Sequence, residues 1–184
     1  VCGFQIVFIG AHLAPYLKDM SATYPDVGRP EVATMALALV GLFNIFGTYY
    51  AGKLGQKFPK HLLLSMIYGS RGIVIAAFIL LPITPFSTYL FAACMGFLWL
   101  STVPLTNSIL AQIFGVKYLS MLSGFAFLAH QIGSFVGAYL GGYLFDVMGS
   151  YNIVWIIAIA LSVLAAVVNL PIKERELMRP TQTA

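Results

Sequence analysis

Charged side chains are scarce in this sequence. Only 9% of its 184 residues are Asp, Glu, Lys or Arg, whereas an average soluble protein carries roughly 25%. Hydrophobic residues make up 60%, and the mean hydropathy is +0.90. A water-soluble core cannot hide that much apolar surface. The composition therefore excludes an ordinary soluble domain and indicates a protein embedded in the lipid bilayer, which is both its solvent and a predicted partner.

Several motifs that carry chemistry are also absent. The two cysteines, Cys2 and Cys94, stand far apart without C-x-x-C or metal-ligand spacing, so no disulfide, metal or other cofactor is expected. No GxxxxGK[ST] loop is present, which argues against direct use of ATP, and no basic stripe suggests a nucleic acid partner. A rhomboid-type intramembrane protease needs Gly-x-Ser-Gly, but Ser123-Gly124 follows Met121-Leu122. The sequence gives no support for an enzyme.

What the sequence has instead is six long apolar runs separated by short polar connectors. A hydrocarbon core of roughly 30 Å requires about 20 helical residues, and a backbone in lipid must satisfy its own hydrogen bonds. The alternating strands of a membrane barrel are absent. The sequence therefore predicts an all-α membrane protein with helices over residues 1–17, 32–50, 62–81, 86–113, 118–144 and 151–170, followed by a tail over 171–184.

The lysines and arginines gather in alternate connectors. Short cytoplasmic loops collect these residues, so the richer side is predicted to be cytoplasmic, together with both ends of the chain. That side holds Lys53, Lys57, Lys60, Lys117, Lys173, Arg175 and Arg179. The other side holds Lys18 and Arg29, beside the acidic residues Asp19, Asp26, Glu31 and Asp146.

A short motif recurs at the same place in two successive sets of three helices. Residues 51–56, AGKLGQ, stand at the end of the second predicted helix, and residues 141–146, GGYLFD, stand at the end of the fifth, ninety positions later. Three crossings are an odd number, so two such sets in one chain are inverted relative to each other. The sequence therefore predicts two inverted three-helix repeats.

The first copy of this motif resembles a known signature. The stretch GKLGQKFPK, residues 52–60, is similar to the loop G-x-L-x-D-[RK]-x-G-[RK] of the major facilitator superfamily, which recurs after the second helix of each six-helix half. Gln56 replaces its Asp and Pro59 replaces its Gly, which puts a charge-latch role of this loop in doubt. The stretches at 2–17 and 130–155 look like bacterial carriers related to the monocarboxylate and oxalate/formate transporters.

This resemblance implies helices seven to twelve of a twelve-helix secondary transporter in the plasma (bacterial inner) membrane, with a missing N-terminal half before Val1. Such a protein moves a small organic solute by alternating access. A membrane arginine and two membrane histidines, without membrane acids, favour a carboxylate anion, and a histidine is compatible with proton coupling. A self-assembling six-helix channel or carrier is the alternative.

The fifth predicted helix carries a glycine at every fourth position, Gly133, Gly137 and Gly141, and His130 and Ser134 lie on the same face. Small residues at this spacing let two membrane helices approach closely. The face is therefore predicted to contact protein, with His130 near mid-membrane. A histidine there can take up and release a proton, although packing across the glycine face is a competing interpretation.

The resemblance adds a second role at the same place. In oxalate-type carriers a cationic residue on the corresponding helix holds the substrate carboxylate, and the matching position here is His130 or the adjacent Gln131.

Arg71 is the one Lys or Arg within a predicted span, the tenth residue of 62–81. Placing it in a bilayer costs about 2.5–3.5 kcal/mol, so a compensating partner is expected. No acidic residue lies in the apolar spans, which leaves four candidates: a substrate anion, a carboxylate of the missing half, a helix C-terminus or a lipid phosphate. In the superfamily the third helix of each set is peripheral, which favours a structural role.

Polar stripes occur on the first and fourth predicted helices. In the superfamily, the first helix of each three-helix set lines the central cavity, so both stripes are candidates for the substrate pathway, although such stripes also serve plain helix packing. The stripes are Gln5, His12 and Tyr16, and Trp99, Thr102 and Thr106. Together with the residues above, the candidate substrate-binding set is His130, Gln131, Gln5, His12, Trp99, Thr102 and Arg71.

The charge asymmetry makes the topology testable. A cysteine placed at Lys57 is expected to resist a membrane-impermeant thiol reagent added outside intact cells, whereas a cysteine placed at Asp26 is expected to react, because the basic connectors stay inside. A mass-tag shift on a gel measures both. Labelling at Lys57 with protection at Asp26 would reverse the orientation.

Overall fold

The computed structural model describes residues 1–175, and helices dominate this part of the chain. They are α1 (Cys2–Met20), α2 (Pro30–Leu54), α3 (Lys60–Leu80), α4 (Pro85–Leu98), α5 (Thr102–Phe114), α6 (Leu119–Met148) and α7 (Asn152–Asn169), with the short 3-10 helices η1 (Pro25–Val27) and η2 (Val116–Tyr118). No strand occurs among residues 1–175. The predicted all-α class is confirmed; Arg179 of the predicted inner charges lies outside the described residues.

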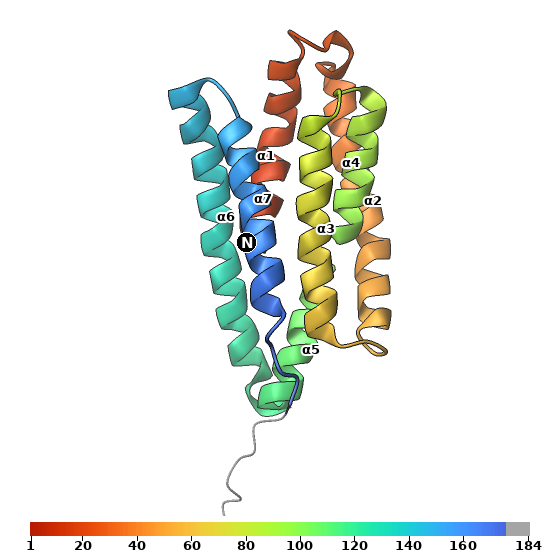
Figure 1. Ribbon diagram of the computed structural model, residues 1–184, viewed down its shortest axis with the longest axis vertical. Helices are drawn as coiled ribbons and strands as arrows, with labels where there is room; N and C mark the ends of the chain where they lie inside the picture. Colours follow the sequence, from red (N-terminus) through yellow and green to blue (C-terminus); the bar gives the residue numbers. More distant parts are fainter. Residues whose placement is uncertain (176–184) are drawn as a thin grey trace, which may run out of the picture.

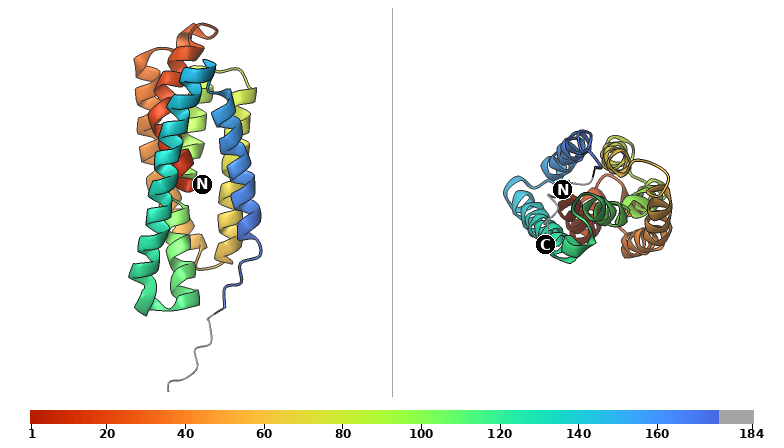
Figure 2. Two further views of the ribbon diagram at one scale, coloured as in Figure 1. Left: turned by 90° about the vertical axis from the view of Figure 1, so that its left-hand side faces the viewer. Right: turned by 90° about the horizontal axis from the view of Figure 1, so that it is seen from below.

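The helices form one elongated bundle (Figure 1). Five segments are long and apolar enough to cross a membrane: Pro30–Leu54, Lys60–Leu80, Pro85–Phe114, Val116–Met148 and Asn152–Asn169. The α1 helix, from the first predicted run, is not among them. One side of α1 packs inside the bundle, where Phe8, Ile9 and Leu13 are fully buried, whereas Gly10, Ala11 and Ala14 are exposed. The connectors α2–α3 and α5–α6 lie at one end of the bundle, whereas α1–α2, α3–α4 and α6–α7 turn at the other (Figures 1 and 2).

Three helix pairs make the main contacts: α1 with α6, α2 with α4, and α3 with α7. In two three-helix repeats, α1 corresponds to α4, α2 to α6 and α3 to α7. Under this correspondence the α1–α6 pair becomes the α4–α2 pair, and the α3–α7 pair is unchanged. The packing therefore has the symmetry of two inverted three-helix repeats, as the recurring motif predicts.

Glycines make the equivalent contacts at equivalent positions. A Cβ on Gly137 of α6 would overlap the carbonyl oxygen of Phe4 in α1. Ninety positions earlier, a Cβ on Gly47 of α2 would overlap the carbonyl oxygen of Phe97 in α4. Both helix pairs therefore approach with backbone against backbone, which lipid-embedded helices achieve with small residues.

The partner helices return the same contact. A Cβ on Gly3 of α1 would overlap the carbonyl oxygen of His130 in α6, and a Cβ on Gly96 of α4 would lie 2.6 Å from the carbonyl oxygen of Val40 in α2. His130 and Val40 are again ninety positions apart. In the predicted glycine stripe of α6, Ser134, Gly137 and Gly141 are buried, so this face contacts protein as expected.

Two predicted boundaries differ from the structure. The run 86–113 is not one helix, because α4 ends at Leu98 and α5 begins at Thr102. Pro104 lies in the first turn of α5, where a backbone N–H has no intrahelical acceptor, so it removes no hydrogen bond. The second motif copy, 141–146, lies inside α6, which continues to Met148 and ends at Gly149 with a φ of +66°.

The symmetric glycine contacts predict equal sensitivity at two distant sites. Gly47→Ala and Gly137→Ala each force two backbones apart, and overpacking of this kind costs about 1–3 kcal/mol. Gly41→Ala is the matched control, because no atom lies within 4 Å of its added Cβ. The melting temperature in detergent and the yield of folded protein on gel filtration should fall for the first two variants and not for the control. An unchanged melting temperature for Gly47→Ala would contradict the inference that the two helix pairs pack in the same way.

Candidate functional site

The turn between α4 and α5 is the one place in the middle of the described bundle where a predicted span is broken. Arg71 of α3 reaches this turn. Its Nε donates to the Leu98 carbonyl at 3.2 Å, and its Nη2 donates to the carbonyls of Leu98 and Trp99, both at 2.5 Å. Backbone carbonyls at a helix C-terminus carry partial negative charge. Of the four expected partners for Arg71, the structure places a helix C-terminus beside it.

The other face of the turn is held by side chains from α2 and from the turn itself. Asn44 Oδ1 accepts the backbone N–H of Leu100 at 3.1 Å and the hydroxyl of Thr48 at 3.3 Å. Ser101 Oγ donates to the Phe97 carbonyl at 2.5 Å. The backbone groups released by the unwinding therefore find side-chain partners, as membrane-buried backbone requires.

Gln5 extends this network across the bundle. Its Oε1 accepts from Arg71 Nη1 at 3.4 Å, while its Nε2 donates to the Ala158 carbonyl at 2.9 Å and to Ser162 Oγ at 2.5 Å. Gln5, Arg71 and Ser162 are each at most 1% exposed. One continuous polar network thus joins α1, α3, α4 and α7 inside an otherwise apolar bundle.

A group of buried and half-buried side chains adjoins this network. The Cys2 thiol lies 3.6 Å from the Thr102 hydroxyl, and it also interacts with the side chains of His130 and Arg71. The His130 ring stacks on Phe127 with centroids 6.0 Å apart. Four helices, α1, α3, α5 and α6, therefore bring a thiol, a hydroxyl, an imidazole and a guanidinium together. We call Cys2, Gln5, Arg71, Thr102 and His130 the polar cluster.

The structure brings four of the predicted site residues into the polar cluster: Gln5, Arg71, Thr102 and His130. Trp99 contributes its carbonyl, whereas its indole packs against the hydrophobic core. Gln131 is exposed on the other side of α6. His12 lies apart from the cluster, where its Nε2 is 2.9 Å from the Ala138 carbonyl and its ring packs on Phe8 and Tyr151.

Sequence reasoning missed two members of this neighbourhood. The candidate substrate-binding set does not include Cys2 or Tyr68, whose ring lies 5.2 Å from the Arg71 guanidinium. Tyr68 stands three residues before Arg71 in the same helix, and this spacing places two side chains on one face. That spacing is the signal that could have found it.

A groove opens beside the broken turn. It measures about 520 Å³, within the range of small-molecule sites. The polar lining comes from Asn44 and Thr48, which also support the turn. The full lining is Asn44, Ile45, Thr48, Tyr49, Leu100 and Val103.

Comparisons with known proteins agree on one family. The family model described as Major Facilitator Superfamily matches residues 1–137. The chain belongs to the major facilitator superfamily. It is therefore an integral membrane protein of a transporter family, which confirms the resemblance of the signature loop.

Curated relatives within the superfamily are similar over most of this chain. The chain is 26% identical to an uncharacterized MFS-type transporter, YcxA, from Bacillus subtilis over 175 residues, which is 92% of this chain and 41% of that protein. It is 27% identical to monocarboxylate transporter 13 from Bos taurus over 160 residues, 85% of this chain and 35% of the relative. The chain thus spans about two fifths of the length of these relatives.

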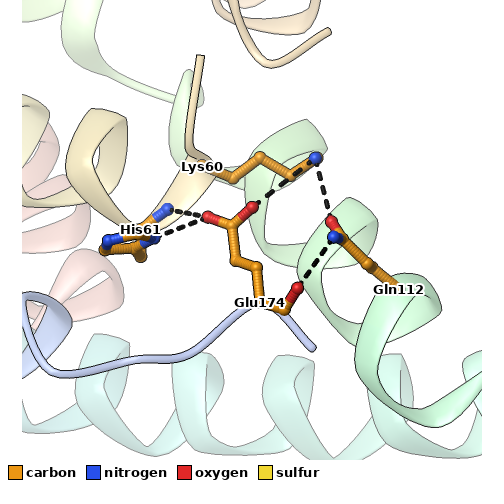
Figure 3. Close-up of polar contacts among 4 residues, drawn as sticks. All are labelled: Lys60, His61, Gln112 and Glu174. Atoms are coloured by element: carbon orange, nitrogen blue, oxygen red, sulfur yellow. Dashed lines mark hydrogen bonds and ion pairs between the residues drawn. The ribbon is translucent and has the colours of Figure 1, made fainter. Parts of the chain in front are cut away.

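A second polar cluster lies at the end of the superfamily signature loop (Figure 3). The Glu174 carboxylate, after α7, accepts the backbone N–H of His61 at 2.6 Å and lies 2.7 Å from His61 Nδ1 and 3.7 Å from Lys60 Nζ. Gln112 of α5 accepts from Lys60 at 3.0 Å and donates to the Glu174 carbonyl at 3.0 Å. This cluster, which we call the inner clamp, ties the chain after α7 to α3 and α5.

Charge at the inner clamp is set by its neighbours. Burial by itself raises the pKa of the Glu174 carboxyl, but the hydrogen bonds from His61 and the nearby Lys60 ammonium outweigh it, so the pKa lies below its ordinary value. A depressed pKa means that the ionised form stabilises the clamp above the ordinary carboxyl pKa, and that this contribution is lost as pH falls through the lowered value.

Glu174→Gln tests the inner clamp, because it keeps the shape of the side chain and removes the charge. Hydrogen exchange of residues 171–175 and of the first turn of α3 should quicken several-fold at pH 7. The contribution of the ionised carboxyl should also vanish from the pH dependence of that exchange. Glu31→Gln, at the exposed first turn of α2, is the control and should change neither region. Equal exchange in Glu174→Gln and the parent protein would refute the clamp.

Proposed function

We propose that this chain is one six-helix half of a secondary transporter that moves a small carboxylate anion by alternating access, and that a second six-helix half completes it. The observation that carries this proposal is the polar cluster at the broken span, where a buried guanidinium lies near a half-buried thiol and a half-buried imidazole inside apolar helices. Superfamily membership and the similarity to monocarboxylate transporter 13 support it.

The charges of the described spans favour an anion. Arg71 is buried, and the acidic residues among residues 1–175 lie at helix ends or in connectors: Asp19, Asp26, Glu31, Asp146 and Glu174. Intramembrane ionisable residues are expensive and usually mark a pathway. A positive centre without a carboxylate attracts a negatively charged solute and repels a cation.

His130 is the proposed point of contact with the solute and with a coupling proton. Its ring is half-buried, stacks on Phe127 and interacts with the Cys2 thiol, which in turn lies 3.6 Å from the Thr102 hydroxyl. Gln131 and Trp99 are proposed to line the same pathway, and His12 remains a second candidate proton site. The groove beside Asn44 provides space at the face of the broken turn opposite Arg71.

Uptake into proteoliposomes tests the function. The full-length transporter that contains this chain should take up radiolabelled lactate saturably, with faster uptake under an inward proton gradient, whereas the 184-residue chain alone should give none because half of the cavity wall is absent. Robust uptake by the chain alone would instead show a self-assembling carrier. A full-length protein that carries no monocarboxylate would refute the proposed solute class.

The same assay tests His130. His130→Ala should lower uptake about tenfold, in line with the loss of a hydrogen bond to a charged group, and flatten its dependence on pH between 5 and 8. Leu128→Ala, which removes an exposed side chain from the same helix, should leave uptake and pH profile unchanged. Normal uptake by His130→Ala at every pH would make the histidine a packing residue.

A further inference from the structure

We propose that Arg71 is a positioning residue of the transport site, which holds the broken turn between α4 and α5 so that Thr102 stays beside Cys2. The proposal rests on the transport function proposed above, but its structural part can be measured without a substrate.

Hydrogen bonds to this chain engage all three nitrogens of the Arg71 guanidinium. Nε and Nη2 donate to the carbonyls of Leu98 and Trp99, and Nη1 donates to Gln5. The centroid of the Tyr68 ring lies 5.2 Å from the guanidinium carbon, and the Arg71 residue is 1% exposed. A solute carboxylate would have to displace these acceptors to reach the cation. Arg71 therefore acts on the solute through the turn that it holds.

The buried cation and the broken helix compensate each other. Among the described residues, the ion pairs involve Asp26 and Glu174, and neither pairs with Arg71. The helix α4 ends at Leu98, so its last carbonyls lack intrahelical donors. These carbonyls supply the partial negative charge that the guanidinium lacks, and the guanidinium supplies the donors that the carbonyls lack. Removal of Arg71 leaves two carbonyls unpaired.

Asn44 holds the same turn from the opposite side. Its Oδ1 accepts the Leu100 N–H, and the Thr48 hydroxyl bonds the same oxygen and orients the amide. Successive peptide groups of the turn are thus held by side chains of two different helices, α3 and α2. Thr102, the first residue of α5, follows directly, with its hydroxyl 3.6 Å from Cys2 Sγ. The position of Thr102 is therefore set by Arg71 and Asn44 together.

Hydrogen exchange of peptides covering residues 96–104 measures how firmly the backbone of the turn is held in the full-length protein. Arg71→Gln should quicken exchange at Leu100 to Thr102 at least tenfold. Arg71→Lys should also quicken it, because one ammonium group cannot bridge two carbonyls and Gln5 as the planar fork does. Ser65→Ala is the control on the same helix, since its hydroxyl bonds the Ala166 carbonyl of α7 instead. It should leave this peptide unchanged.

A matched pair at Asn44 keeps the proposal testable if the Arg71 variants do not fold. Asn44→Asp retains an acceptor for the Leu100 N–H, so the Leu100 amide hydrogen should exchange nearly as slowly as in the parent protein. In Asn44→Ala the same amide hydrogen should exchange several-fold faster. Equal exchange in both variants would overturn the proposed role of Asn44 in holding the turn. Slow exchange in Arg71→Gln would overturn the role of Arg71.

Lactate uptake separates positioning from direct contact. A positioning role predicts that Arg71→Lys lowers the maximal rate about tenfold with KM within twofold of the parent. A KM raised tenfold or more, together with unchanged exchange of residues 96–104, would show that Arg71 contacts the solute and would overturn the proposal. If the parent protein carries no lactate, the proposed function fails, while the exchange measurements still decide whether Arg71 holds the turn.

Discussion

A guanidinium group without a carboxylate partner is the constraint around which this bundle is arranged. Arg71 is 1% exposed in the middle of an apolar structure, where an unpaired charge is costly. The chain satisfies it by ending a helix beside it, so that the carbonyls of Leu98 and Trp99 accept its N–H groups. The break in the span and the presence of the arginine are therefore one feature, because each leaves unsatisfied groups without the other.

Close backbone packing by glycines provides the scaffold for that arrangement. Gly47 and Gly137 bring α2 against α4 and α6 against α1 at equivalent places in the two repeats. The two repeats differ at the broken turn, which occurs in only one of them. The counterpart of Leu98, ninety-three positions earlier, is Gln5, and there α1 continues unbroken while the side chain bonds Arg71 and Ser162. A symmetric frame thus carries an asymmetric polar centre, which comes from single residues and not from the fold.

The sequence predicts the frame better than it predicts the centre. Hydropathy and the ninety-residue spacing indicate helices, inverted repeats and the glycine face of α6, because these depend on patterns within one helix or one repeat. The sequence does not predict the break at 99–101. The nearest helix-breaking residue, Pro104, lies in the first turn of α5, where it removes no backbone hydrogen bond. The break depends on Arg71 and Asn44, which are distant in sequence. Cys2 was missed for the same reason: its polar neighbours come from three other helices.

The helix α5 is held at both of its ends by polar contacts and in between by apolar ones. Arg71 and Asn44 hold the turn before it, whereas Lys60 and Glu174 hold its inner end through Gln112. Between them, Leu105 and Ile109 pack in a small core separate from the main one. The two polar attachments differ in exposure, because Arg71 at the turn is 1% exposed whereas the side chains of Lys60 and Glu174 are 18% and 12% exposed. Water and ions can therefore weaken the attachment at the inner end, whereas the attachment at the polar cluster is shielded from them. Because Arg71 holds the end of α5 at which Thr102 stands, the position of Thr102 beside Cys2 depends on the more deeply buried of the two attachments.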